Sequence, residues 1–474
     1  MSGIADPPSA PVSVMLSTPV FFRAPGVMIL FLFLWGINLS VFKALRINYH
    51  GALNMVPEDL LEPRQIFQAV GVLGSLLAVC ITGYLWSGAD AVFIPEAYPV
   101  IFYAAALLIL LSPFDRFFHR QRMAAWGILR RVFAARVPIA FTEVLVADGL
   151  TSLAKAFGDM EVTICIISTV VAVAWSGGDP DHVHTHNLEE DAYNALPGCI
   201  HSFFIPIIIS VPFVVRLRQC LAARQHYLSI GASSSSTSAA SAGYSNPGVV
   251  AGTPLVQGHD PATPLSASAF VSVSPLASLT AAPSGPAAAA ASHRIAFDAI
   301  PLFGPWLNSL PHDAAVQTLN ATKYLSALPV IWLSAMKRNY PGSEWLPFYR
   351  MLWLLAVSIN SLYGFVWDIR MDWGLLQSSA ANGPLLRPHT LYPAGAYYAA
   401  LALNLALRVT WSLKLSSHLH LTGEWYIFMF EMLEVFRRFI WIFFRVEWEC
   451  VRRGDGIATV RKPSLKADLD DAQK

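Results

Sequence analysis

Residues 433–447 read LEVFRRFIWIFFRVE, an apolar run that contains charged side chains. Its polar members at i, i+3, i+4 and i+7 fall on one face of a helix, and they are Glu434, Arg437, Arg438 and Trp441. A charge at the centre of a bilayer costs roughly 2.5–3.5 kcal/mol if it faces lipid. This segment is therefore predicted to be a membrane helix whose charged face lines a protein interior or a water-filled path.

The whole chain has the composition of a membrane protein. Of its 474 residues, 55% are hydrophobic and 13% are charged. A water-soluble surface needs roughly twice that share of charge, so most of the chain is predicted to avoid water. The formal net charge of +1 gives no indication of nucleic-acid binding.

Apolar runs long enough to cross about 30 Å of hydrocarbon recur along the chain. They cover 27–45, 66–86, 97–112, 139–175, 200–218, 320–336, 346–367, 393–415 and 425–446. The run 139–175 is too long for one straight crossing and contains Asp148, Lys155, Asp159 and Glu161, so it is either one broken helix or two short spans. We predict an all-α, polytopic transmembrane helical bundle of about nine spans, with eight to ten compatible with the pattern.

The orientation follows from the basic residues. Residues 114–137 carry six arginines and no lysine, interleaved with apolar residues at helical spacing. That pattern predicts an amphipathic helix on the cytosolic membrane surface, and a plain basic loop is the alternative. The loops 87–96 and 176–199 lack lysine and arginine and are placed on the far side. The N-terminus is then lumenal and the C-terminus cytosolic.

The predicted spans and loops divide the chain into six segments. Residues 229–292 are rich in Ser, Ala, Pro and Gly, with Asp260 as the sole formal charge, and are predicted to be disordered. The predicted segments are a lumenal N-terminus at 1–26, spans and a basic helix at 27–138, a bundle segment at 139–228, a low-complexity cytosolic loop at 229–312, a second bundle segment at 313–450 and a cytosolic tail at 451–474. We expect no removable signal peptide.

The five cysteines are scattered along the chain. Their odd number and their position in or beside apolar runs predict no disulfide framework and no CxxC metal site. A candidate metal site lies in the 176–199 loop, where His182, His184 and His186 alternate with other residues. An extended strand would place these imidazoles on one side, as a zinc or copper site requires. We favour solvated histidines in a flexible acidic loop, and predict no metal and no other cofactor.

Further charged residues lie inside the apolar segments of the second half. The cations Lys323, Arg408, Arg437 and Arg438 face the acids Asp148, Asp372 and Glu434, a local excess of one positive charge. The planar guanidinium of arginine donates paired hydrogen bonds to phosphate oxygens, and interleaved carboxylates would weaken binding enough for release. The alternative is a set of structural ion pairs that join helices.

Six ordered motifs resemble the EXS-domain family, whose best-known members export phosphate. They are ADGLTSL at 147–153, PFVVRLRQCL at 212–221, NATKY at 320–324, WDIRMDWGL at 367–375, LRVTW at 407–411 and LEVFRRFIWIFFRVE at 433–447. The resemblance makes 139–228 and 313–450 the two parts of an EXS domain. Thr151 stands where the family usually has Asn.

The resemblance implies a phosphate path through a helical bundle. According to the resemblance, the residues that line or gate this path are Asp148, Thr151, Lys323, Tyr324, Asp372, Arg408, Trp411, Glu434, Arg437 and Arg438. Lys323 and the arginines would contact phosphate, and Trp411 would narrow the passage. Asp368 and Arg216 would be structural ends of their helices, with Asn320 and Arg445 in similar supporting positions.

The resemblance extends to one branch of the family. Only about 26 residues precede the first span, too few for the SPX domain of the plasma-membrane exporters. The chain is similar to the SPX-less fungal branch named for defective ER retention and associated with the Golgi. That branch implies return of phosphate from the lumen to the cytosol, in support of glycosylation and of the retention and recycling of ER and Golgi residents.

Three classes of function remain open at this stage. A phosphate transporter or channel is favoured, with phosphate and the lipid bilayer as partners. A non-transporting scaffold would bind glycosyltransferases or coat-associated sorting factors, and a homodimer is compatible with either. A membrane enzyme is disfavoured, because the His cluster lies in a loop remote from the buried carboxylates and no nucleophile–base pair is evident.

Overall fold

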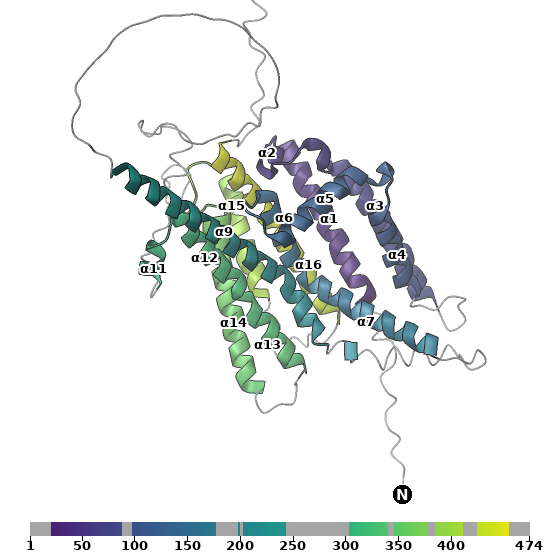
Figure 1. Ribbon diagram of the computed structural model, residues 1–474. Coiled ribbons are helices and arrows are strands. Elements are labelled where there is room, and N and C mark those ends of the chain that lie inside the picture. The colour runs from purple at the N-terminus through teal and green to yellow at the C-terminus, as the bar shows by residue number, and fades with distance from the viewer. Residues whose placement is uncertain are drawn as a thin grey trace, which may run out of the picture.

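The computed structural model consists of helices packed side by side (Figure 1). It describes residues 20–87, 97–176, 198–199, 202–242, 303–339, 346–376, 384–410 and 424–454, and these ranges contain no strand. The longer helices are α1 (Val20–Ala44), α3 (Pro63–Trp86), α4 (Ala97–Leu111), α5 (His119–Ala134), α6 (Phe141–Ser152), α7 (Ala154–Ser176), α9 (Phe204–Ala242), α12 (His312–Leu325), α13 (Ala327–Asn339), α14 (Leu346–Trp367), α15 (Ala394–Val409) and α16 (Glu424–Arg453). The all-α prediction is confirmed.

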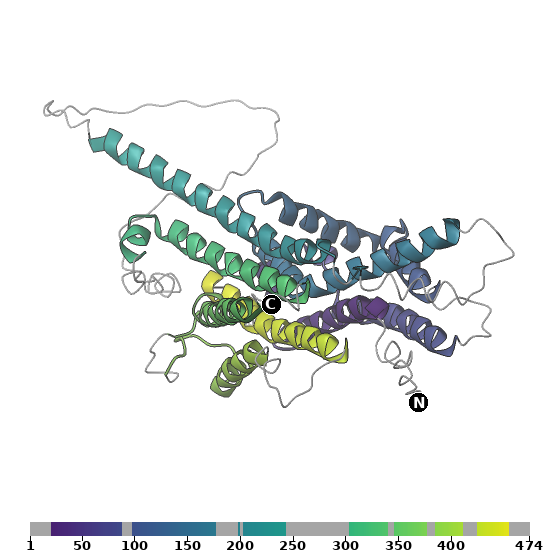
Figure 2. The same cartoon turned by 90° about the horizontal axis from the view of Figure 1, so that it is seen from below.

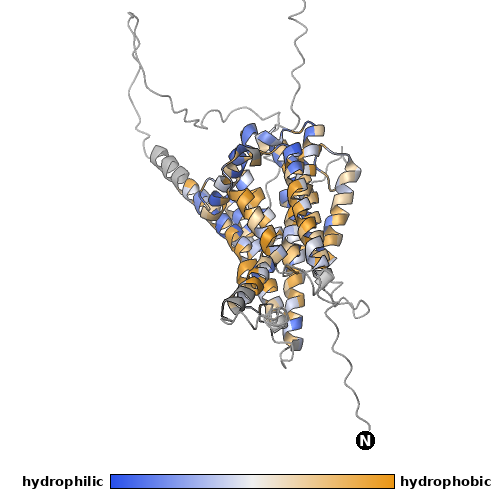
Figure 3. Cartoon of the chain, turned by 90° about the vertical axis from the view of Figure 1, so that its right-hand side faces the viewer, coloured by the Kyte–Doolittle hydropathy of each residue, from blue (hydrophilic) through white to orange (hydrophobic). Residues whose placement is uncertain are grey.

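Four helical segments are long and apolar enough to cross a membrane by length and composition. They are Val20–Ala44, Pro57–Trp86, Phe204–Ala232 and Pro347–Asp372, and the shorter apolar helices Ala97–Leu111 and Ala394–Val409 accompany them. Figure 3 shows hydrophobic residues along the middle of the bundle and hydrophilic residues gathered at its upper end. The chain is a membrane helical protein, and the count of nine spans stays a prediction.

The 139–175 segment is two helices, one of the two alternatives expected. Helix α6 ends at Ser152 and α7 begins at Ala154. The N–H of Leu153 donates to the carbonyls of both Gly149 and Leu150, which tightens the last turn and changes the chain direction.

The 320–336 segment, predicted as one span, is also two helices. Helix α12 ends at Leu325 and α13 begins at Ala327. Pro329 lies in the first turn of α13, and because it has no N–H it cannot donate to the carbonyl four residues earlier. The Ser326 hydroxyl instead donates to the Lys323 carbonyl at 2.8 Å, which closes the end of α12.

The predicted loop at 229–312 begins later than its composition indicated. Helix α9 continues through Ala242, α11 (Gly304–Asn308) follows within the range, and α12 starts at its last residue, His312. Residues 232–242 contain only Ala, Ser and Thr, and the helix propensity of Ala together with the absence of Gly and Pro lets the helix propagate. Figure 2 shows this end of α9 projecting beyond the other helices. Residues 243–302 lie outside the described residues.

The predicted basic helix at 114–137 is present as α5. Arg120 of this helix forms a 2.8 Å ion pair with Asp59 in the connection between α2 (Tyr49–Leu53) and α3, and Arg131 pairs with Glu143 of α6 at 2.8 Å. Trp126 and Phe133 are exposed on the same helix. An exposed helix with both apolar and basic side chains fits a membrane surface.

Helices α1 and α16 lie at the centre of the packing. Helix α1 contacts α3, α7 and α16, and α16 contacts α1, α15, α2 (Tyr49–Leu53) and α6. Trp373, Trp441 and Tyr397 are fully buried in the largest apolar cluster, which joins these elements. Burial of large aromatic rings on several helices fixes how α16 is rotated, and so which of its residues face inward.

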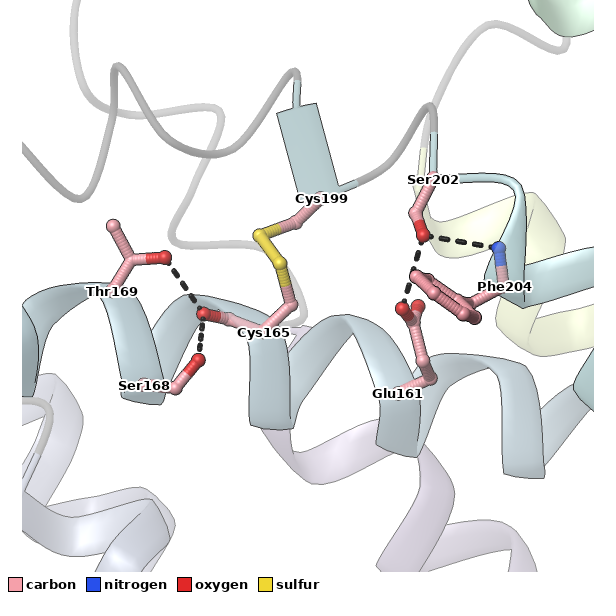
Figure 4. The surroundings of a disulfide bond; sticks show 7 residues. All are labelled: Glu161, Cys165, Ser168, Thr169, Cys199, Ser202 and Phe204. Atoms are coloured by element: carbon pink, nitrogen blue, oxygen red, sulfur yellow. Dashed lines mark hydrogen bonds between the residues drawn. A yellow bond between two sulfur atoms is a disulfide. The ribbon is translucent and has the colours of Figure 1, made fainter.

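The expectation that the cysteines form no disulfide is wrong. Cys165 of α7 and Cys199, just before α9, form a disulfide across 34 residues (Figure 4). Glu161 accepts a hydrogen bond from the Ser202 hydroxyl beside it, at 3.2 Å. Nothing in the sequence spacing brings the two cysteines together, because their proximity depends on α7 and α9 packing against each other.

The disulfide gives a test of orientation, because disulfides persist in oxidising compartments. Alkylation of the denatured, unreduced protein should label Cys80, Cys220 and Cys450, and reduction should add two more labels. Intact-mass measurement before and after reduction reads the difference. Five labels without reduction would contradict the disulfide, and three labels would support a lumenal position for this end of the bundle.

Candidate functional site

Helix α16 presents its charged face to the interior of the bundle. The Arg437 guanidinium donates from Nε to Glu434 Oε2 at 2.8 Å and from Nη2 to Glu434 Oε1 at 2.6 Å. This two-bond geometry is the most directional pairing that arginine forms with a carboxylate. The prediction that these residues lie on one face of the helix is confirmed. Of the two adjacent arginines, Arg437 is the one that pairs with Glu434.

Asp368 is the centre of the ion-pair cluster. Its carboxylate is 1% exposed and lies 2.6 Å from Arg408 Nη2, 3.4 Å from Arg437 Nη1 and 3.6 Å from Lys323 Nζ. It therefore joins α12, α15 and α16 to the end of α14. The assignment of Asp368 as a structural end of its helix stays a prediction; α14 ends at Trp367, and residues 368–372 form a π-helical turn that carries this carboxylate into the core.

Asp372, on the same turn, binds a different set of groups. Its carboxylate lies 3.3 Å from Lys323 Nζ and 3.7 Å from Arg445 Nε, and it accepts a 3.2 Å hydrogen bond from Trp441 Nε1. Lys323 thus lies between the two aspartates of the turn. Arg445, which lies within α16, also pairs with Glu449 at 3.4 Å, and its supporting role stays a prediction.

Arg216 forms a second buried network. It lies within α9 and is 3% exposed, so the prediction that it ends its helix is wrong. Arg216 Nε donates to Asp148 Oδ1 at 2.8 Å, and the Tyr324 hydroxyl donates to the same oxygen at 2.6 Å. Arg216 Nη2 donates to the Tyr324 hydroxyl oxygen at 3.0 Å, and Nη1 to Gln219 Oε1 at 2.6 Å. This network ties α6, α9 and α12 together.

Arg438 differs from the other buried arginines because it pairs with no carboxylate within the described ranges. Its Nε donates to the Ser152 hydroxyl at 2.8 Å and its Nη2 to the Thr151 hydroxyl at 3.3 Å. The guanidinium lies over the Trp441 ring, 4.5 Å from its centroid. Ser152 in turn donates to Glu434 Oε1 at 2.8 Å. Among the described residues, the groups that contact the positive charge of Arg438 directly are therefore neutral.

A cavity of about 380 Å³ lies beside these networks, and Asp148, Arg216, Asp368 and Asp372 are not part of its lining. Its charged lining consists of Lys155, Lys323, Arg408, Arg437 and Arg438 with Glu431 and Glu434. Five basic and two acidic side chains thus line the cavity, and Asp159, Asp368 and Asp372 pair with four of the five cations from outside the lining. The volume suits a small ligand, and the charge suits an anion. No group of His, Cys, Asp or Glu that could hold a metal occurs among the described residues.

Three contributors to the site escaped the sequence reasoning. Ser152 and Glu431 lie on the cavity surface, but a serine and a glutamate near helix ends carry no distinctive sequence signal. Gly364 lets Arg408 reach Asp368, because a Cβ there would lie 2.5 Å from Arg408 Nη1. A glycine inside an apolar helix is the one signal that could have indicated this close approach.

Asn320, Trp411 and the three loop histidines were also candidate site residues. Asn320 lies on α12, and its buried Oδ1 accepts no hydrogen bond from the described part of the chain. Trp411 and the histidines His182, His184 and His186 lie outside the described residues. That the other positions line a phosphate path stays a prediction, and the contacts given above say which groups each of them binds.

Comparison with known proteins gives the family. The pattern described as the EXS family matches residues 18–240 and 308–451, which include every charged residue of the cavity. The chain belongs to the EXS family. The resemblance predicted from the six motifs is confirmed.

Individual relatives are 23–24% identical to the chain over the aligned residues. Solute carrier family 53 member 1 from Homo sapiens is 23% identical over 454 residues, covering 94% of this chain and 52% of the relative. The Xenotropic and polytropic retrovirus receptor 1 homolog from Xenopus laevis is 23% identical, with the same coverage. Protein ERD1 homolog 2 from Schizosaccharomyces pombe is 24% identical over 361 residues, covering 74% of this chain and 66% of the relative. The chain spans about half the length of the human and frog proteins.

The Asp148–Arg216 pair should be a large contributor to stability. Asp148→Ala leaves a buried arginine without its carboxylate and should lower the free energy of unfolding by about 3–5 kcal/mol. Tyr324→Phe, which removes one hydrogen bond, should cost about 1–2 kcal/mol. Thermal unfolding of the detergent-purified protein measures both.

The matched control is Asp59→Ala, which breaks the surface pair with Arg120 and should change stability by about 0–1 kcal/mol. The double variant Asp148→Ala/Arg216→Met should recover part of the loss, because no uncompensated charge remains. A single variant at Asp148 no less stable than the surface control would contradict the network.

Proposed function

We propose that the chain moves inorganic phosphate through this cavity, from the lumen of a Golgi-type compartment to the cytosol. The observation that carries the proposal is Arg438, a buried cation on the cavity surface whose direct polar contacts are hydroxyl groups. A phosphate oxygen can accept from its guanidinium without first displacing a carboxylate. The resemblance of the six motifs to phosphate exporters supports phosphate as the substrate, and the solute-carrier name of the human relative supports a transport function.

The neighbouring carboxylates give a physical route to release. Asp368 and Glu434 hold Arg408 and Arg437 in ion pairs when no anion is bound. An arriving phosphate competes with these acids for the same donors, so part of its binding energy offsets broken ion pairs. Binding is then weak enough for the anion to leave, which transport requires.

The cellular role in this proposal is the recovery of phosphate released by lumenal glycosylation. Such recovery would support glycosylation and the retention and recycling of ER and Golgi residents. The resemblance to the ER-retention branch, and the ERD1 homolog among the relatives, support this assignment.

Phosphate flux in liposomes tests the proposal. Purified wild-type protein should carry radiolabelled phosphate, and Arg438→Ala should reduce the rate about 10–100-fold, the effect of losing charge-assisted hydrogen bonds worth about 1.5–3 kcal/mol. Arg438→Lys should recover part of the rate, because the charge remains while the planar fork is lost.

The matched control is Arg120→Ala, which removes an exposed arginine remote from the cavity and should carry phosphate at the wild-type rate. No flux in the wild type, or equal flux in wild type and Arg438→Ala, would reject the transport proposal. A non-transporting scaffold predicts that Arg438→Ala still restores glycosyltransferase retention in deficient cells.

A further inference from the structure

A second charged group adjoins the cavity, where α1, α7 and α16 pack together. Arg23 Nε of α1 lies 3.1 Å from Asp159 Oδ2, and the Lys155 ammonium donates to the other oxygen of that carboxylate. Lys155 Nζ also lies 3.6 Å from Glu431 Oε1. Lys155 therefore lies between two carboxylates from different helices, while Arg23 supports one of them.

Glu431 is held more weakly than Asp159. Its side chain is 6% exposed, and neither of its carboxylate oxygens accepts a hydrogen bond from the described residues. The charged groups that face it are Asp159 and Lys155 from α7 and Arg23 from α1. Within this part of the chain, Lys155 is the one cation at ion-pair distance from it. The negative charge on Glu431 thus depends on the position of one flexible lysine.

Lys155 is also accessible from the cavity. Its side chain is 38% exposed, and it lines the same 380 Å³ space as Arg438. On α16, Glu431 lies seven residues before Arg438, about 10 Å along the helix axis and on the same face. An anion near Lys155 would therefore be displaced by about two helical turns from the Arg438 site, toward the predicted lumenal end.

We propose that Lys155 forms a second oxyanion site and that an anion bound there is accompanied by one proton on Glu431. When Lys155 turns to the anion, Glu431 loses its nearby cation and remains buried without a hydrogen-bond donor. A carboxyl group in that environment favours the neutral acid. The carboxylate takes one proton from water, and no bond of the anion changes. The identity of the anion as phosphate rests on the proposed function.

The proposal links anion binding to pH. Because binding promotes proton uptake by Glu431, anion affinity should rise as pH falls, by at most about tenfold per pH unit for one linked proton. Phosphate itself titrates over the same range, but equally for every variant. The ratio of half-saturating phosphate concentrations between wild type and variant therefore isolates the contribution of the protein.

Phosphate uptake into proteoliposomes at about pH 5.5 to 8 measures this ratio. Glu431→Gln mimics the protonated acid. At the acidic limit, the half-saturating phosphate concentrations of the wild type and this variant should therefore be about the same. At the alkaline limit, the wild type should need at least about fivefold more phosphate than the variant. Lys155→Met should raise the half-saturating concentration about tenfold and should lose the additional pH dependence, because the linked site is gone.

The matched control is Glu434→Gln, one turn away on α16 and also on the cavity surface. It breaks the Arg437 pair and should lower the flux, yet it should keep the wild-type pH dependence. A constant ratio between wild type and Glu431→Gln over the whole pH range overturns the inference. If Glu431→Gln does not fold, the test uses Lys155→Met instead. A pH dependence of phosphate affinity in Lys155→Met equal to that of the wild type would also overturn the inference.

Failure of the inference differs from failure of the transport proposal. Flux in the wild type with unchanged pH dependence in both variants rejects only the linked site. If the wild type carries no flux, equilibrium binding of radiolabelled phosphate to the purified proteins makes the same comparison. A pH-dependent binding ratio would then support the linked site without transport, and no saturable phosphate binding would reject both.

Discussion

A charge inside a membrane protein must find a partner or reach water, and this constraint organises the bundle around Asp368. The carboxylate is 1% exposed and faces cations from three other helices. Arg408 pairs with no other carboxylate in the described ranges, and Lys323 and Arg437 each share Asp368 with one further acid, so the rotation of α12, α15 and α16 is coupled to the π-helical turn that carries Asp368. The apolar packing of Trp441 and Trp373 on the same elements holds the turn in place. Ion pairs here therefore specify which faces meet, while apolar burial stabilises the contact.

The cavity is possible because the pairing is incomplete. Asp148 and Arg216, which lie with Tyr324 in a satisfied network, are fixed by short hydrogen bonds. Arg438 faces hydroxyl groups instead, so a positive potential remains where the cavity lies. A fully paired interior would bind no anion, and a wholly cationic one would not release it. The two kinds of environment coexist within one bundle because α6 contributes Asp148 to the first and Thr151 and Ser152 to the second.

Sequence reasoning located the helices and most charges, since charged residues inside apolar runs are conspicuous. The face formed by Glu434, Arg437 and Arg438 follows from helical periodicity alone. What the sequence could not supply was pairing between distant segments. Asp368 and Asp372 look alike in the motif, and only the π-helical turn separates their partners. The Cys165–Cys199 disulfide and the Lys155–Glu431 contact likewise depend on how α7 packs against α9 and α16. Pro329 indicates the break at Ser326, but the hydrophobic run around it led to the prediction of a single span.

The geometry also separates fixed cations from adjustable ones. Arg437 uses a planar fork with two bonds of 2.6 and 2.8 Å to one carboxylate, and its reorientation would break both at once. Lys323 lies 3.3 and 3.6 Å from two different aspartates, so it can shift between them while remaining close to a negative charge. Lys155 occupies the same kind of position between Asp159 and Glu431. A lysine is a point charge on a flexible stem, and it can follow an anion with little rearrangement. Movement of an anion along the cavity should therefore be accommodated first by the two lysines, whereas contact with Arg408 or Arg437 requires the anion to displace a carboxylate.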